Sequence, residues 1–416
     1  MNKELYKQSH EIINASITAV QPESAVIRAL SDSAWLKHAK RIFIIAIGKA
    51  AWKMAKTATQ CIDDKIFAGG VAITKYGHSF GDLPKIIVYE AGHPIPDINS
   101  FSATEEAIKM IKGLSENDYV LFLVSGGGSA LFEKPLIPHK ELESITEQLL
   151  ASGADIVEMN TIRKRLSAVK GGRFAQLCAP AKIFSIVLSD IIGDPLDMIA
   201  SGPAYPDSST CQQAFEIINK YGINLGLEAK KCLATETPKK LDNVATKVSG
   251  SVSELCIAAA NKCKELGYAP QILTDSLNCI ARDAGIFLAS IARFHKNTHK
   301  SMAFLAGGET VVKLTGAGKG GRSQEIALAA AAGIAGIKNI AIFSFGSDGT
   351  DGPTDAAGGY VDGSTLAKLR EKNIDVHTVL KNNDAYHALD AINGLIKTGP
   401  TGTNVNDLAV VLIQGK

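Results

Sequence analysis

Short runs of Ile, Val, Leu and Phe alternate with helical segments along this chain, and this alternation constrains the fold most. Five such runs occur at residues 41–47, 70–74, 85–89, 119–124 and 182–188. Predicted helices at 50–61 and 102–112 lie between them. Strands that are apolar along their whole length are typical of a parallel sheet with helices on both faces. The pattern therefore predicts an α/β fold.

A second set of elements follows a polar, lysine-rich stretch near residues 235–250. It contains a predicted helix at 253–266 and predicted strands at 271–274, 302–305, 311–314 and 340–345. A chain of 416 residues exceeds what one hydrophobic core usually supports. We therefore expect two α/β domains with an active site in the cleft between them. Residues 1–235 would form a Rossmann-like parallel sheet, and residues 236–416 a smaller α/β domain.

Charge, hydropathy and cysteine usage narrow the class of protein. Lys and Arg number 44 against 42 Asp and Glu, and the sequence has no basic tail, which argues against a nucleic-acid partner. Its first residues lack the apolar core expected of a signal peptide, and we expect no membrane span, because no apolar segment is long enough to cross a membrane. The seven cysteines are scattered without Cys-x-x-Cys pairs, as in reduced proteins. We expect a cytoplasmic protein; a homodimer is compatible with the sequence but is not determined by it.

Glycine and polar residues follow several predicted strands directly. Strand 41–47 runs into Gly48-Lys49, 119–124 into Ser125-Gly126-Gly127-Gly128-Ser129, and 182–188 into Ser189-Asp190. Strand 302–305 is followed by Gly307-Gly308-Glu309. Open α/β sheets bind ligands beyond the carboxyl ends of their strands. The repeated pattern favours one anionic ligand over a series of unrelated turns.

The loop Ser125–Ser129 fits a strand-turn-helix whose N–H groups converge on a phosphate or carboxylate. A tight turn in an α/β unit is the alternative, although three consecutive glycines cost conformational entropy that a simple turn does not require. Lys49 stands at the predicted start of a helix, where a positive charge is unfavourable. It is therefore either a tolerated surface lysine or a cation directed at phosphate.

Two further candidates for anion binding lie outside the glycine-rich loop. In the basic segment 160–173, Arg163, Ser167 and Lys170 would share one face of a helix, although such runs are usually solvated. His93 lies in a loop bounded by prolines, where a lone histidine is more often structural. Arg163, Lys170 and His93 are therefore secondary candidates.

Residues Gly316–Gly321 match the pattern Gly-x-Gly-x-x-Gly, which taken literally predicts dinucleotide binding. The acidic residue that should follow on the next strand is misplaced. Lys319 and Arg322 instead bring two cations to this loop, and Arg322 offers a rigid fork for phosphate or carboxylate. A surface arginine at a helix start is the alternative for Arg322.

An acidic loop, Ser347 to Asp355, follows the predicted strand 340–345. Its carboxylates repel one another and resist burial, which favours a hydrated cation such as Mg²⁺ carrying nucleotide phosphates. The spacing is not that of an EF-hand, and a solvated acidic turn is the alternative. Asp348 and Asp351 are the predicted metal ligands, whereas Asp355 fits a cap of the next turn.

Together these motifs resemble the type II glycerate kinase family (glycerate 2-kinase, MOFRL) over nearly the whole chain. The segments that carry the resemblance are Val124–Leu131, Leu188–Pro203, Gly307–Thr310, Gly320–Glu325 and Ser347–Gly352. It implies transfer of the γ-phosphoryl of ATP to the 2-hydroxyl of D-glycerate, giving 2-phosphoglycerate and ADP, with Mg²⁺ as cofactor.

The resemblance also implies residue roles. Lys49, Asp190 and Arg322 match catalytic positions; Lys49 and Arg322 would stabilise the phosphoryl group and the carboxylate. Asp190 would orient or deprotonate the 2-hydroxyl, or share in binding the metal. The remaining candidates divide into an anion-binding loop (Ser125, Gly126, Gly127, Gly128, Ser129), nucleotide-binding residues (Gly308, Glu309, Gly321) and metal ligands (Asp348, Asp351).

Two other classes of function remain open from the residues. An NAD(P)H-dependent hydroxypyruvate reductase rests on the single glycine fingerprint at Gly316–Gly321. A non-catalytic module that binds a nucleotide or sugar acid would use the same loops without turnover.

Overall fold

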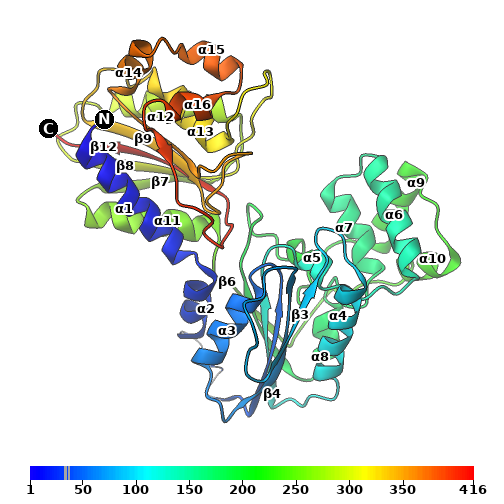
Figure 1. Cartoon of the computed structure of the whole chain (residues 1–416). Helices are drawn as coiled ribbons and strands as arrows, with labels where there is room; N and C mark the ends of the chain where they lie inside the picture. The colour runs from blue at the N-terminus through cyan, green and yellow to red at the C-terminus, as the bar shows by residue number, and fades with distance from the viewer. Residues whose placement is uncertain (32–34, 36–37) are drawn as a thin grey trace. The chain divides into compact units, whose positions relative to one another are not determined.

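Six strands between residues 41 and 248 form a wholly parallel sheet in the computed structural model, which describes residues 1–31, 35 and 38–416 (Figure 1). The strands are β1 Arg41–Ile47, β2 Phe67–Lys75, β3 Ile86–Ala91, β4 Asp118–Val124, β5 Lys182–Val187 and β6 Val244–Val248. Their order is β3-β2-β1-β4-β5-β6. Strand order reverses between β1 and β4, and such a switch point is where open α/β sheets bind ligands. The predicted Rossmann-like parallel sheet is confirmed.

Helices cover both faces of this sheet, which explains why its strands are apolar throughout. Ile42 and Ile44 of β1 share a core with α2 (Pro22–Ser31) and α3 (Ala51–Cys61). Ile45 and Ile47, which point the other way, share a core with α4 (Ile98–Ile111) and α8 (Arg173–Cys178). Successive side chains of a strand alternate between faces, so both sets of positions must be apolar here.

Four helices form a separate cluster beside the sheet (Figure 1). They are α6 His139–Ala151, α7 Ile156–Arg165, α9 Cys211–Tyr221 and α10 Leu227–Leu233, and they enclose a small core of their own. Two short helices connect this cluster with the sheet: α5 (Gly128–Leu131) follows β4, and the 3₁₀ helix η2 (Ile199–Ser201) follows β5. Both lie at the carboxyl end of the sheet.

The second sheet is mixed. Its strands are β7 Ala269–Leu277, β8 Met302–Gly308, β9 Ile340–Gly346, β10 Gly358–Asp362, β11 Leu395–Ile396 and β12 Asp407–Ile413, in the order β11-β10-β9-β12-β8-β7. Only β7 and β8 pair in parallel, whereas β12 is antiparallel to both of its neighbours. The predicted strand at 311–314 is wrong, because only Val311 pairs there, in an isolated bridge with Ile280.

Helices also cover both faces of the second sheet (Figure 1). One face packs against α1 (Lys3–Ala19) and α11 (Val252–Glu265). The other face is covered by α12 Ala281–Phe294, α13 Arg322–Ala331, α14 Thr365–Glu371, α15 Val376–Lys381 and α16 Ala385–Asp390. The expected second α/β domain is therefore present.

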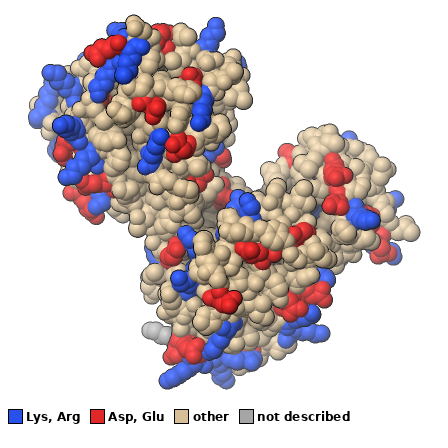
Figure 2. Space-filling view, in the orientation of Figure 1, with Lys and Arg blue, Asp and Glu red and all other residues tan. Residues whose placement is uncertain are grey.

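Each sheet belongs to a compact unit. The β1–β6 unit comprises residues 25–189 and 194–249, and the β7–β12 unit comprises residues 1–24, 190–193 and 250–416. The chain thus passes between units at residues 24/25, 189/190, 193/194 and 249/250. The last of these is the end of the expected hinge, and β6 joins the first sheet where a linker was expected. Basic and acidic side chains are interspersed on the face shown in Figure 2. Among the described helices, none combines the length and apolar character needed to cross a membrane.

Candidate active site

Lys49 follows β1 at the switch point of the parallel sheet, and its side chain is exposed. Its backbone N–H donates to the carbonyl of Gly126 at 2.9 Å, so the β1 loop is joined to the glycine-rich loop after β4. Within the described part of the chain, the Lys49 ammonium has no carboxylate partner. The backbone is therefore fixed while the charge remains available to an anion.

The glycine-rich loop presents unpaired backbone donors beside Lys49. Among the described residues, the N–H groups of Gly126, Gly127 and Ser129 have no protein acceptor. Gly127 has φ +86, and a Cβ there would lie 2.9 Å from the His93 ring and 3.4 Å from Cγ of Lys49. Only glycine allows this close approach. The structure thus brings Lys49, His93 and the loop together, as an anion-binding concavity requires.

His93 stands in a field of positive charge. Burial lowers its pKa, and the charges of Lys49, Lys75 and His78 lower it further. Lys75 ends β2, and Nδ1 of His78 lies 3.3 Å from the Lys49 carbonyl. The sequence analysis missed Lys75 and His78, although their position just after a predicted strand was a usable signal. Two neighbouring strands, β1 and β2, thus end in lysines whose charges favour the neutral form of His93, which follows β3.

The two serines of the glycine-rich loop are already engaged with the protein. The buried Ser125 hydroxyl donates to the Ile47 carbonyl at 3.1 Å and accepts from the Ala50 N–H at 3.1 Å. The predicted contact of this hydroxyl with a ligand is therefore corrected: it joins the loops after β1 and β4. Ser129 Oγ lies 3.0 Å from Ser201 Oγ, which belongs to η2.

The segment that carries Ser201 has an unusual backbone. Ala200 and Ser201 have φ values of +52 and +60, and Gly202 follows at +61. A left-handed conformation costs a residue with a Cβ roughly 1–2 kcal/mol. Such strain persists only where the surrounding structure determines the conformation, and it is concentrated at functional sites. A Cβ on Gly128 would lie 2.8 Å from the Ala200 Cβ, so this segment packs directly on the glycine-rich loop.

The basic segment 160–173 is mostly buried, and its basic residues do not share one face of a helix as the sequence predicted. Helix α7 ends at Arg165, and Lys170 lies beyond it, fully buried in an ion pair with the buried Glu133. Burial lowers the pKa of Lys170 to about 8. The predicted substrate contact by Lys170 is therefore corrected, because its ammonium is enclosed. Arg163, in the last turn of α7, is half-buried and stays a candidate.

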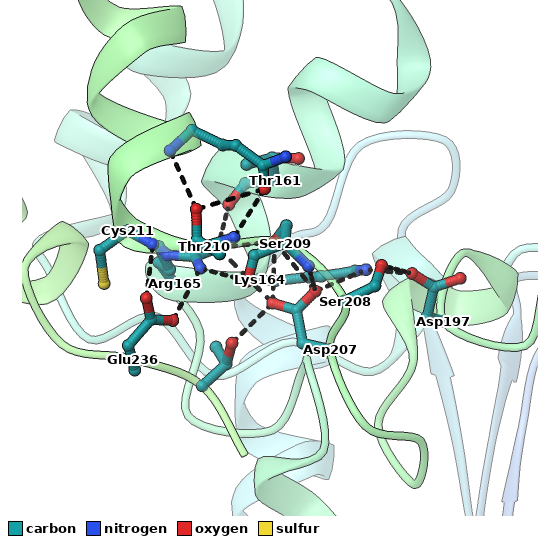
Figure 3. Close-up of polar contacts among 12 residues, drawn as sticks. Thr161, Lys164, Arg165, Asp197, Asp207, Ser208, Ser209, Thr210, Cys211 and Glu236 are labelled. Carbon is teal, nitrogen blue, oxygen red and sulfur yellow. Dashed lines mark hydrogen bonds and ion pairs between the residues drawn. The ribbon is translucent and has the colours of Figure 1, made fainter. Parts of the chain in front are cut away.

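Lys164 and Arg165 belong to a buried polar network (Figure 3). Lys164 Nζ contacts Asp207 Oδ1 at 3.1 Å and Asp197 Oδ2 at 3.3 Å. Arg165 pairs with Asp207 at 3.5 Å and with Glu236 at 3.2 Å. Because Asp197 precedes η2 and Asp207 follows it, the network fastens the strained segment to helix α7.

Arg322 is the centre of a second polar group, in the β7–β12 unit. Its Nε and Nη2 donate to Asp407, and its Nη1 donates to Glu309 Oε1 at 2.8 Å. Burial opposes its charge, but the hydrogen bond to Asp407 and the carboxylates of Asp407, Glu309 and Asp351 raise the pKa of Arg322. Unlike Lys49, Arg322 is fully paired.

Asp190 belongs to the same unit. Its carbonyl accepts from Nδ2 of Asn406 at 3.3 Å, and that amide also lies 3.4 Å from Glu309 Oε2. Asn406, which directly precedes β12, and Asp407, its first residue, were missed from the sequence because strand β12 itself was not predicted. The structure thus gathers Asp190, Glu309 and Arg322 around one pair of unpredicted residues.

The two predicted metal ligands differ sharply. Asp351 is buried, and its carboxylate accepts from the N–H groups of Ser323 at 3.2 Å and Gln324 at 2.8 Å, the first turn of α13. Burial raises the pKa of Asp351 to about 6. Asp351 therefore caps a helix, which corrects its predicted role as a metal ligand. Asp348 is half-buried, and one of its oxygens accepts from the Thr350 N–H at 2.9 Å.

The described residues do not form a metal cage of their own. Among residues 1–31, 35 and 38–416, no group of three His, Cys, Asp or Glu side chains is arranged to hold an ion. An ion of Mg²⁺ that carries nucleotide phosphates needs only one or two carboxylates. Asp348 fits that requirement, and Asp351 does not.

The predicted nucleotide-binding glycines have packing roles. A Cβ on Gly308 would lie 2.3 Å from the backbone of Leu277, and one on Gly321 would lie 2.3 Å from the Asp351 carboxyl. Glycine at 308 allows β7 and β8 to approach, and glycine at 321 admits the Asp351 cap. Neither observation tests a nucleotide contact, which stays a prediction.

The fingerprint at Gly316–Gly321 lacks the structure that dinucleotide binding needs. The preceding strand, β8, ends at Gly308 and does not run into the fingerprint. The fingerprint's backbone is instead hydrogen-bonded to the turn before α16 through Asn383 and Asp384. Cβ atoms on Gly316 and Gly318 would meet Asn382 and Asp384 at 2.4–2.5 Å. These glycines therefore serve packing against that turn, and the dinucleotide interpretation is wrong.

Comparison with family models assigns most of the chain. Residues 8–234 match the model described as "Domain of unknown function (DUF4147)", and residues 302–407 match the MOFRL family. A D-glycerate 2-kinase of Thermotoga maritima is 49% identical over 415 residues, with 98% of each chain covered. A glycerate 2-kinase of Pyrococcus horikoshii is 41% identical, with 97% of this chain and 96% of that protein covered.

Two further comparisons bear on fold and on the reductase alternative. A crystal structure of the Thermotoga maritima glycerate kinase superposes with a TM-score of 0.92 at 48% identity, covering 99% of this chain and all of that one. A protein from Agrobacterium vitis named putative hydroxypyruvate reductase is less similar, at 36% identity over 97% of this chain and 93% of its own length.

Proposed function

Because this chain belongs to the type II glycerate kinase (MOFRL) family, we propose that it transfers the γ-phosphoryl of ATP to the 2-hydroxyl of D-glycerate. The products are ADP and 2-phosphoglycerate. The observation that carries the proposal is at the switch point, where the Lys49 ammonium has no carboxylate partner and the N–H groups of Gly126 and Gly127 have no acceptor among the described residues. Phosphoryl transfer depends mainly on positioning and on neutralising negative charge, and these groups offer both.

In the proposed reaction, the 2-hydroxyl oxygen of glycerate bonds to the γ-phosphorus while the bond from that phosphorus to ADP breaks. The hydroxyl proton goes to Asp190, the candidate base. Lys49 and the N–H groups of the glycine-rich loop stabilise the anions of the substrates. Arg322 contributes its guanidinium after exchanging Glu309 or Asp407 for an anionic ligand. The shared cleft in which these residues would meet remains a prediction.

Of the two predicted metal ligands, the proposal assigns only Asp348 to binding Mg²⁺. When bound, the ion neutralises charge on the nucleotide phosphates. The proposal leaves Asp351 out of this role because its carboxylate is buried and already accepts hydrogen bonds from two N–H groups of α13. The cytoplasmic location and the homodimer expected from the sequence remain predictions.

A paired assay tests the function. ADP release is measured with Mg-ATP and D-glycerate, and oxidation of NADH or NADPH is measured with hydroxypyruvate. We expect turnover only in the first assay, because the fingerprint on which the reductase alternative rested is a packing loop. Hydride transfer without ADP release would overturn the proposal. Binding of D-glycerate without turnover in either assay would identify a non-catalytic module.

A further inference from the structure

Three buried or half-buried side chains form a hydrogen-bonded chain that ends at the glycine-rich loop. Ser201 Oγ donates to Asn160 Oδ1 at 3.0 Å, and Ser129 Oγ lies 3.0 Å from Ser201 Oγ. Asn160 and Ser201 are buried, whereas Ser129 is half-buried. Ser129 is therefore the end of the chain that a ligand can reach.

The chain has a direction, because a serine hydroxyl carries a single proton. Ser201 uses its proton on the Asn160 oxygen, so it can only accept from Ser129. The Ser129 proton is then committed to Ser201, and the free side of Ser129 Oγ offers lone pairs. Ser129 is consequently an acceptor toward a ligand and recognises a donor, not a phosphate oxygen. This differs from the role in anion binding predicted for the Ser129 side chain, while the loop N–H groups keep that role.

The hydrogen-bonded series Ser129–Ser201–Asn160 also cannot carry a proton away from a ligand. It ends on an amide oxygen, which does not take up a proton near neutral pH, so Ser129 has no route for relaying one. The substrate hydroxyl that meets Ser129 must therefore be one that keeps its proton through the reaction. In glycerate this is the 3-hydroxyl, since the 2-hydroxyl loses its proton on phosphorylation.

We propose that Ser129, oriented by Ser201 and Asn160, accepts a hydrogen bond from the 3-hydroxyl of glycerate and so selects dihydroxy acids over 2-hydroxy acids without that group. This inference rests on the proposed function. Ser201 and Asn160 are positioning residues, and Ser129 is the contact.

The strained backbone supports the proposal, because it holds Ser201 in the required place. Ser201 is left-handed at φ +60, and its carbonyl accepts from the Gly171 N–H at 3.0 Å. The Gly202 carbonyl accepts from the Gly172 N–H at 2.7 Å. The Lys164–Asp197 and Lys164–Asp207 contacts fasten the segment on either side (Figure 3). Pre-organised polar groups discriminate strongly against a ligand that leaves them unpaired.

The test compares dissociation constants for D-glycerate and D-lactate, which lacks only the 3-hydroxyl, by titration calorimetry. We expect wild type to bind D-glycerate about 10-fold more tightly, as one well-placed neutral hydrogen bond allows. Ser129→Ala should bring the ratio of the two dissociation constants to about 1, mainly by weakening D-glycerate binding. Ser201→Ala should narrow it by roughly 2- to 5-fold, because Ser129 is then free to rotate. If Ser201→Ala folds poorly, Ser201→Gly replaces it in the test, because glycine adopts the positive φ without strain, and it should narrow the ratio by the same amount.

Two further variants make the test specific. Asn160→Asp keeps an acceptor for Ser201 and should preserve the ratio of the two dissociation constants. If this variant narrowed the ratio as much as Ser201→Ala does, the hydrogen bonds would run in the opposite direction, from Asn160 to Ser201 to Ser129, and the proposal would be overturned. Ser102→Ala, which deletes a hydroxyl at an exposed position of α4, should leave both dissociation constants unchanged. An active wild type with an unchanged ratio in Ser129→Ala would overturn this inference alone. A wild type that neither binds nor phosphorylates D-glycerate would instead overturn the proposed function.

Discussion

The two polar groups of this molecule are built in opposite ways. At the switch point of the β1–β6 unit, Lys49 and the loop N–H groups have no described protein partner. In the β7–β12 unit, Arg322 is paired with Asp407 and Glu309. Unpaired groups contribute little to folding and are free to bind, whereas paired groups stabilise the fold and must exchange partners to act. Substitutions in the two groups should therefore separate activity from stability.

Lys49→Ala should give the largest effect on activity and almost none on folding. We expect kcat to fall on the order of 10²- to 10³-fold, as on removal of one group that stabilises transition-state charge. The melting temperature should stay within about 2 °C of wild type, because surface substitutions away from paired groups usually change stability by less than about 0.5 kcal/mol. ADP release and thermal unfolding provide the two readouts.

Lys65→Ala, which removes an exposed lysine elsewhere in the same unit, is the matched control and should leave both readouts unchanged. Near-normal turnover in Lys49→Ala would remove Lys49 from the mechanism. A large loss of stability would show that its ammonium has a structural partner.

Arg322→Ala should lower both activity and stability. The change leaves Asp407 and Glu309 without their cation, and a buried carboxylate without a partner is costly. Since the Arg322 side chain is 34% exposed, we expect a loss of about 1–3 kcal/mol, at the low end for broken ion pairs. Urea unfolding and ADP release measure the two effects. Arg322→Lys keeps the charge but loses the two-pronged guanidinium, so its activity and stability should lie between those of wild type and Arg322→Ala. An Arg322→Ala protein as stable as wild type would contradict the view that Arg322 stabilises the fold through its ion pairs.

Asp348→Ala and Asp351→Ala should separate metal binding from helix capping. Asp351→Ala removes the cap of α13 and should cost about 1–2 kcal/mol. Asp348→Ala should lower the free energy of unfolding by less than Asp351→Ala does. It should instead raise the Mg²⁺ concentration needed for half-maximal ADP release several-fold. Equal metal dependence in wild type and Asp348→Ala would remove the last predicted ligand.

The pH dependence of Asp351→Asn tests the burial of the Asp351 carboxyl. Burial raises the pKa of Asp351 to about 6, above its value in the unfolded chain. The folded state therefore holds this proton more tightly, and the stability that protonation provides is lost as pH rises from about 4 to about 6. The stability difference between Asp351→Asn and wild type should shift in favour of the variant over this window. A constant difference in urea unfolding free energy across it would contradict the assigned burial.

The interpretation of the glycine motifs shows where sequence reasoning succeeds and fails. The triple glycine after β4 was correctly taken as a loop at a strand end, because a uniformly apolar strand followed by glycines leaves few other structures. The fingerprint at Gly316–Gly321 is equally suggestive as a pattern, but the preceding strand, β8, ends at Gly308 and does not run into it. Its glycines are required by contacts with residues 382–384, which are distant in sequence. Spacing alone does not distinguish a glycine that admits a ligand from one that admits another part of the chain.

The sequence by itself determined the alternation of buried strands and helices, the existence of two α/β units and the polar residues at strand ends, because hydrophobic periodicity and turn chemistry are local. Only the tertiary structure decided which charges are free. Lys170 and Lys49 are both lysines near glycines, yet Lys170 is enclosed with Glu133 and Lys49 is exposed. Likewise, Asp348 and Asp351 lie three residues apart, yet only Asp351 caps α13. Burial and pairing depend on contacts between distant segments, and these arise only when the sheets and helices pack.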